Sequence, residues 1–122
     1  MRHYARFIVV WTFLSIFAGP FFAAESLDES INYLLDYVAK SDATFIRNGQ
    51  THTPQEAASH IKAKYEHFKD KIKTPEDFIR LSASKSLQTG QPYLVRTRDG
   101  KEMHLDLWLR NALKEHQAAK HD

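Results

Sequence analysis

The sequence has no cysteine among its 122 residues, so no disulfide supports the fold and no thiol chemistry is available. Glycine and proline are scarce, with four of each, and all eight stand where a turn, a break or a helix start is expected. The stability of the domain must therefore come from packing alone.

An excess of charge of one sign is lacking as well, once the N-terminus is set aside. Residues 1–24 contain two arginines and no acidic residue, whereas the following 98 residues carry 15 basic and 15 acidic side chains. A neutral, mixed surface gives no electrostatic basis for binding nucleic acid or for a general attraction to anionic lipid. We therefore expect no nucleic-acid partner.

The first 24 residues have the layout of a secretory signal peptide. A short basic start over residues 1–6 precedes an uncharged apolar stretch, a break at Gly19-Pro20 and small residues that end at Ala24. We expect cleavage after Ala24, which places the protein in the periplasm with no membrane span in the remainder. Phe22 stands where a small residue is preferred, so an uncleaved inner-membrane anchor is the alternative.

The remaining chain predicts one helical domain over residues 25–116 and a polar C-terminal tail over 117–122. Apolar residues repeat at helical spacing in four segments, which predicts four helices. The second and third helices have strong start signals, because Thr53 and Thr74 are each followed by proline and then by an acidic residue in the capping-box position. The first is expected to begin near Ser26 or Asp28, and the last carries an apolar face from Leu105 to Leu113.

Two short segments predict extended backbone. Residues 44–47 lead into Asn48-Gly49, a strong turn signal, and residues 93–97 alternate before Asp99-Gly100. The two segments can pair as a minimal ribbon. The predicted fold class is therefore mainly α, a small bundle of about four helices with a short two-stranded β-ribbon.

A polar ridge follows the second predicted helix, because Glu56, His60 and Lys64 recur at four-residue spacing. One interpretation is a solvated ridge with modest ion pairing. The other is that the ridge lines a small site, with His60 as proton donor or acceptor and Lys64 as a contact for an anion. The spacing alone does not decide between the two.

Further candidate residues lie next to the predicted turns. The backbone of a short strand holds Arg47 in place, and the Gly90–Tyr93 turn adds an aromatic ring. Such groups can hold a carboxylate, a phosphate or a peptide end, although turn chemistry and core packing would explain them equally. The candidate binding residues are Arg47, Asn48, His60, Lys64, Ser84, Ser86 and Tyr93.

Two other patterns carry little weight. Ser82 and Lys85 match the S-x-x-K pattern of penicillin-binding enzymes, but the other elements of those enzymes are absent from the sequence. His60 and His67 lie two helical turns apart, about 10 Å, which is too far for one zinc ion to bind both on a helix. We therefore predict no metal and no cofactor, and we assign no catalytic residue.

Four motifs, in this order and spacing, resemble the YfeK-like family of small exported proteins of Gram-negative bacteria. They are Phe45–Gly49, Glu56–Lys64, Thr74–Ser86 and Thr89–Tyr93, within a resemblance that runs from about residue 27 to 113. The resemblance implies export and a compact fold, and it implies no activity. Because the motif residues are mostly polar or turn-forming, we hypothesise that they converge on one polar surface.

The sequence thus predicts a periplasmic binding or accessory module of the cell envelope, whose partner is a small anionic ligand or another envelope protein. Two alternatives stay open. The protein is a small hydrolase-like enzyme, using His60 with Lys64 or Ser84, if the fold forms a cleft with His60 within hydrogen-bond reach of a serine. It is a protein-interaction module if one large apolar patch is exposed without a polar cleft.

Overall fold

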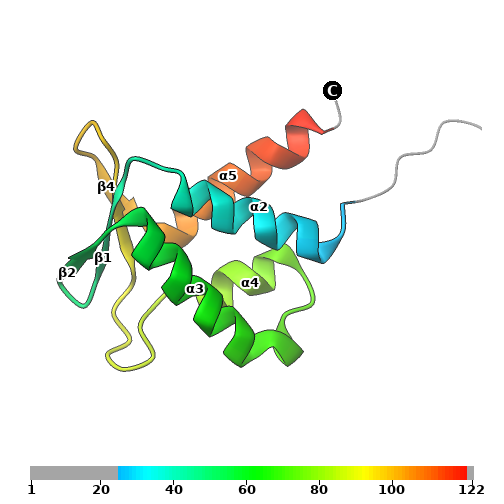
Figure 1. Cartoon of the computed structure of the whole chain (residues 1–122), viewed down its shortest axis with the longest axis horizontal. Helices are drawn as coiled ribbons and strands as arrows, with labels where there is room; N and C mark the ends of the chain where they lie inside the picture. The colour runs from blue at the N-terminus through cyan, green and yellow to red at the C-terminus, as the bar shows by residue number, and fades with distance from the viewer. Residues whose placement is uncertain (1–24, 121–122) are drawn as a thin grey trace, which may run out of the picture.

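The computed structural model describes residues 25–120, so the predicted signal peptide and its cleavage site lie outside the described residues. Four α-helices, one 3-10 turn and four short strands follow one another along this part of the chain (Figure 1). The elements are α2 (Leu27–Ala39), β1 (Thr44–Arg47), β2 (Gln50–His52), α3 (Pro54–Phe68), η1 (Lys69–Lys71), α4 (Pro75–Ser82), β3 (Leu94–Arg96), β4 (Glu102–His104) and α5 (Leu105–Ala119).

Three of the helices begin with a complete capping box. Ser26, Thr53 and Thr74 each accept a hydrogen bond from the backbone N–H three residues later, and the acidic side chain at that position bonds back. Two backbone donors that have no partner inside the helix are thereby satisfied at each start. The boxes predicted at Thr53 and Thr74 are confirmed, and the first helix is capped by Ser26 rather than Asp28.

The sheet is larger than the predicted ribbon, because four antiparallel strands pair in the order β2-β1-β3-β4. The predicted pairing of residues 44–47 with the 93–97 segment is confirmed, since Phe45 lies opposite Val95. The two outer strands were missed. Each is three residues long and mostly polar, so it lacks the apolar alternation that marks a strand in a sequence.

The core lies between the four helices and one face of the sheet, which Figure 1 shows at one end of the helices. Phe45 and Val95 contribute to it from the two central strands, and Phe78 is its largest fully buried side chain. The helical faces expected from the sequence meet there, which confirms a mainly helical fold. The core residues from the helices include Ile31, Leu34, Val38, Ile61, Phe78, Ile79, Leu105, Leu109, Ala112 and Leu113.

The first described residue contacts the last helix. The Glu25 carboxylate lies 2.9 Å from Nε2 of His116 and 3.5 Å from Nζ of Lys120, and it accepts a hydrogen bond from the Ser30 hydroxyl. Burial raises the pKa of Glu25, but the hydrogen bonds and the nearby positive charges outweigh it, so the pKa is below its usual value. These contacts hold the start of α2 against the end of α5.

Among residues 25–120, no helix combines the length and the apolar character that crossing a membrane requires.

Candidate functional site

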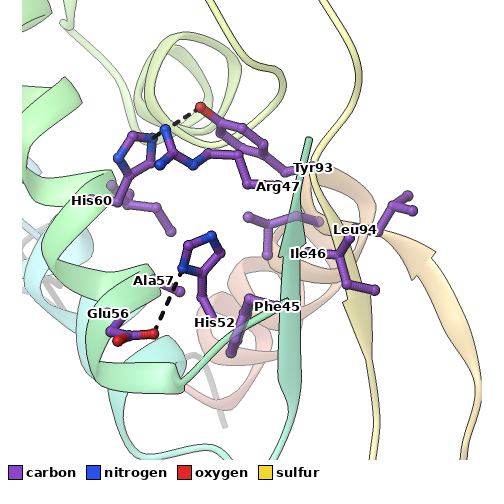
Figure 2. A pocket seen from close by; sticks show the side chains of 11 residues that line it. Phe45, Ile46, Arg47, His52, Glu56, Ala57, His60, Tyr93 and Leu94 are labelled. Atoms are coloured by element: carbon purple, nitrogen blue, oxygen red, sulfur yellow. Dashed lines mark hydrogen bonds and ion pairs between the residues drawn. The ribbon is translucent and has the colours of Figure 1, made fainter. Parts of the chain in front are cut away.

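The register of the first hairpin brings polar side chains to the face of the sheet that α3 covers. Phe45 and Arg47 are two residues apart on β1, so both point toward this face, while Ile46 points away (Figure 2). His52 lies directly opposite Phe45 in the register and shares its face. Asn48 and Gly49 both have positive φ, as a tight two-residue hairpin turn requires, and they set this register.

A cavity of about 110 Å³ lies between this hairpin and the first half of α3. A cavity of this volume has room for several water molecules. Its wall is mixed, with an apolar part from the core and a polar part around Arg47. The lining residues are Phe45, Ile46, Arg47, His52, Glu56, Ala57, His60, Ile61, Tyr93, Leu94 and Leu105.

Arg47, His60 and Tyr93 meet at the polar side of the cavity (Figure 2). Nη1 of Arg47 donates to Nε2 of His60 at 3.3 Å, and the Tyr93 hydroxyl lies 3.1 Å from the same nitrogen. Because Arg47 can only donate, Nε2 of His60 is an acceptor and the ring is neutral, with its proton on Nδ1. Burial, and then the charges of Arg47 and Lys64, lower the pKa of His60, which agrees with this assignment.

Lys64 lies behind Tyr93 and is buried, with only 8% of its surface exposed. Its ammonium donates to the backbone carbonyl of Lys85 at 2.7 Å and to the Tyr93 hydroxyl at 3.3 Å. Burial, together with the charges of Arg47 and Lys85, lowers the pKa of Lys64 to about 8. Burial also raises the pKa of Tyr93, so this hydroxyl stays protonated and can donate toward His60.

Positive charge at the site is not balanced by carboxylates. Among residues 25–120, neither Arg47 nor Lys64 forms an ion pair with an acidic side chain. The acidic residue on the cavity wall is Glu56, whose side chain is 62% exposed and lies 3.6 Å from Nδ1 of His52. The other ring nitrogen of His52, Nε2, is buried without a hydrogen-bond partner.

Asn48 and Ser86 form a second polar cluster, next to Arg47 in the chain. The Asn48 amide donates to the Ser86 hydroxyl at 3.2 Å and accepts from the Thr89 hydroxyl at 2.6 Å, which ties the hairpin turn to the loop before β3. Ser86 also accepts from the backbone N–H of Gln88 at 3.1 Å. This cluster positions the loop that ends at Tyr93.

Ser84 belongs to neither group. Its hydroxyl donates at 3.0 Å to the carbonyl of Ile79, which also accepts from the backbone N–H of Ala83 at the end of α4. The seven candidate residues therefore lie in three places: Arg47, His60, Lys64 and Tyr93 together, Asn48 with Ser86 beside them, and Ser84 at the helix end.

His52 lines the cavity but was not among the binding residues predicted from the sequence. The signal for it was present, because a two-residue Asn-Gly turn places the residue seven positions after Phe45 directly opposite it. The apolar wall from Ala57, Ile61 and Leu105 was assigned to the core alone. Within the described part of the chain, no group of three metal-binding side chains comes together.

Replacing Asn48 with glycine should lower the free energy of unfolding by about 1–2 kcal/mol, because the hydrogen bonds to Ser86 and Thr89 are lost. Glycine tolerates the φ of 52° at this position, so backbone strain does not contribute. Asn48→Ala should lose about 1 kcal/mol more, since alanine is strained there. Urea denaturation of both variants measures the free energy of unfolding. Equal stabilities of Asn48→Gly and the wild type would show that the hydrogen bonds of Asn48 to Ser86 and Thr89 do not stabilise the fold.

Comparison with known proteins identifies the family of the chain. Residues 25–117 match a family described as "Family of unknown function (DUF5329)". The chain belongs to this family. It is also 45% identical, over 64 residues, to the "Uncharacterized protein YfeK" of Salmonella typhimurium, which confirms the resemblance drawn from the four motifs.

The aligned region covers 52% of this chain and 53% of that relative, so the chain spans about half the length of the curated relative that it matches. No solved structure matches the chain. Family membership therefore names no activity, and the cavity is the main guide to function.

Proposed function

We propose that the protein is a binding module of the bacterial cell envelope, exported to the periplasm, that holds a small anionic ligand against Arg47. One observation carries the proposal. The guanidinium of Arg47 lines a cavity and donates to a neutral imidazole, while no carboxylate among the described residues pairs with it. A half-buried cation without a counter-ion is stabilised by an anion placed beside it.

The surroundings favour an anion as well. Lys64 adds a second positive charge behind Tyr93, and the apolar part of the wall lowers the local dielectric constant. Both effects strengthen the attraction between Arg47 and a negative group in the cavity. Glu56 opposes this weakly, because its carboxylate is mostly exposed and faces His52.

The two alternatives receive less support from the structure. The hydrogen-bond partners of Nε2 in His60 are Arg47 and Tyr93, and the hydroxyls of Ser84 and Ser86 are bonded elsewhere. None of these contacts within residues 25–120 forms a serine–histidine pair. The large exposed apolar side chains of the described residues are Leu87 and Leu107, which lie on a loop and on α5. Two such side chains on separate elements are ordinary for a protein surface.

The test is the thermal stability of the purified protein in a panel of small anions, with neutral and cationic compounds beside them. A ligand present at 100 times its dissociation constant adds about 2.7 kcal/mol to the free energy of unfolding. For a domain of this size, that raises the midpoint of thermal unfolding by several degrees. We expect shifts from anions and none from cations.

Replacing Arg47 with glutamine should abolish the shift that a bound anion produces, each variant being compared with its own ligand-free midpoint. The loss follows because glutamine keeps a hydrogen-bond donor but removes the charge. The matched control is Arg98→Gln, since Arg98 is 84% exposed and pairs with Asp42 on the surface. An undiminished shift in Arg47→Gln would place the anion elsewhere and end the proposal.

A further inference from the structure

The cavity also indicates which kind of anion it fits. We infer that the ligand is a small monocarboxylic acid with a short apolar tail, which binds as a carboxylate together with one proton taken up by His52. This inference rests on the proposed function, because it concerns the same cavity and the same contact with Arg47.

The carboxylate part follows from the shape and chemistry of the wall. A guanidinium is a planar fork of donors that matches the two oxygens of one carboxylate. A phosphate carries more charge and more acceptor oxygens, and it is usually held by several cations or by a row of backbone N–H groups. This cavity offers one guanidinium on its wall and an acidic neighbour in Glu56, which suits a single negative charge.

The apolar tail follows from the other side of the cavity. Phe45, Ala57, Ile61 and Leu105 form a continuous wall with the core, away from the polar group at Arg47. A cavity of about 110 Å³ favours a tail of a few carbon atoms over a longer one. Burial of each methylene strengthens binding by a factor of about four, so a chain of three carbons adds substantially to affinity.

The uptake of a proton on binding is inferred from the position of His52. Its Nδ1 faces the carboxylate of Glu56, which favours the proton on that nitrogen. Nε2 is then a bare lone pair, buried and without a partner, and it would repel an incoming carboxylate. Figure 2 shows this nitrogen turned away from Glu56, toward the side where Arg47 and His60 lie. Protonation of Nε2 converts it into a donor to the second carboxylate oxygen.

The groups around His52 leave it as the site of protonation. It is faced by Arg47 from β1 and by Glu56 and His60 from α3. His60 stays neutral, because its Nε2 accepts from Arg47 and lies beside Tyr93 and Lys64. The negative ligand and the added proton cancel, so the net charge of the site is unchanged on binding.

The experiment is calorimetric titration of the full protein at pH 7.5, where a free imidazole is mostly neutral. The probes are butyrate, the uncharged butyramide and inorganic phosphate, each in buffers of different ionisation enthalpy so that proton uptake is counted. We expect butyrate to bind with uptake of close to one proton and butyramide to bind at least tenfold more weakly. Because one proton is taken up, the affinity for butyrate should fall about tenfold for each pH unit between 7.5 and 8.5.

His52→Gln should bind butyrate more weakly and without proton uptake, whereas the exposed His67→Gln should behave as the wild type. If the His52 variant does not fold, the ring signals of His52 in the wild type report its protonation on addition of butyrate by NMR. Butyrate binding without proton uptake, or with no change of the His52 signals, would overturn the role of His52.

The result that overturns the ligand class differs from the one that overturns the proposed function. If phosphate binds at Arg47 and butyrate does not, the carboxylic acid is wrong and the anion-binding function stands. If no anion binds, or if binding is equal in Arg47→Gln, the proposed function is wrong and this inference with it.

Discussion

Replacing Phe78 with alanine is expected to lower the free energy of unfolding by about 3–5 kcal/mol, a large share of what a domain of this size possesses. Phe78 is fully buried at the centre of α4, and its ring makes an edge-to-face contact with Tyr65 of α3. Its removal leaves a cavity at the junction of the helices. No disulfide limits the consequence, since the chain has no cysteine.

Urea denaturation followed by circular dichroism measures the loss, and Phe78→Leu should recover most of the stability because it keeps much of the volume. Leu107→Ala is the control, since Leu107 is 48% exposed and should change stability by less than about 0.5 kcal/mol. A loss below about 1.5 kcal/mol in Phe78→Ala would show that the helices close around the gap.

Replacing Lys64 with methionine should raise the free energy of unfolding at pH 7, by about 1–2 kcal/mol. Burial lowers the pKa of Lys64 to about 8, so keeping its ammonium charged at pH 7 costs the folded state up to about 3 kcal/mol. Methionine fills a similar space without the charge. Part of the gain is offset, because the Lys85 carbonyl and the Tyr93 hydroxyl lose a donor.

The pH dependence separates this cause from a general effect on packing. Between about pH 8 and 10.5 the unfolded chain keeps the lysine proton while the folded protein releases it, so the stability of the wild type rises with pH relative to the variant. The advantage of Lys64→Met should therefore shrink from pH 7 to pH 9.5. Lys62→Met, on the exposed face of α3, should show no such trend. An advantage that stays constant across this range would mean that charge burial is not its source.

The cost of Lys64 bears on the proposed site. A lysine that destabilises the fold, where methionine would not, needs another role, and its hydrogen bond to Tyr93 connects it to His60 and Arg47. We therefore expect Lys64→Met to be more stable and to bind the anion more weakly, since the second positive charge is lost.

The helices were predictable because their signals are local. Thr53 and Thr74 form the boxes that their neighbours in the sequence predict, and Ile31, Leu34 and Val38 are buried as their spacing indicates. The outer strands were not predictable, because Gln50–His52 and Glu102–His104 are extended only through pairing with a central strand. That pairing depends on contacts distant in the sequence.

The candidate site divides in the same way. The turn at Asn48-Gly49 and the polar spacing along α3 are visible in the sequence, and they predicted Arg47, His60 and Lys64 as binding residues. The sequence could not predict whether the polar ridge of α3 faces solvent. Burial of Lys64 depends on Tyr93 and on the Lys85 carbonyl, which are more than 20 residues away in the sequence. The cavity itself arises where the hairpin and α3 meet, so no single segment encodes it.

The contacts of Glu25 with His116 and Lys120 have a consequence for how the domain can be attached to something else. They place both ends of the folded unit together, and Figure 1 shows them away from the sheet end, where β1 and the start of α3 enclose the cavity. A linker, an anchor or a fused protein joined at either end thus leaves the cavity unobstructed. The same proximity makes the domain a candidate for circular permutation, with a short linker joining residues 120 and 25.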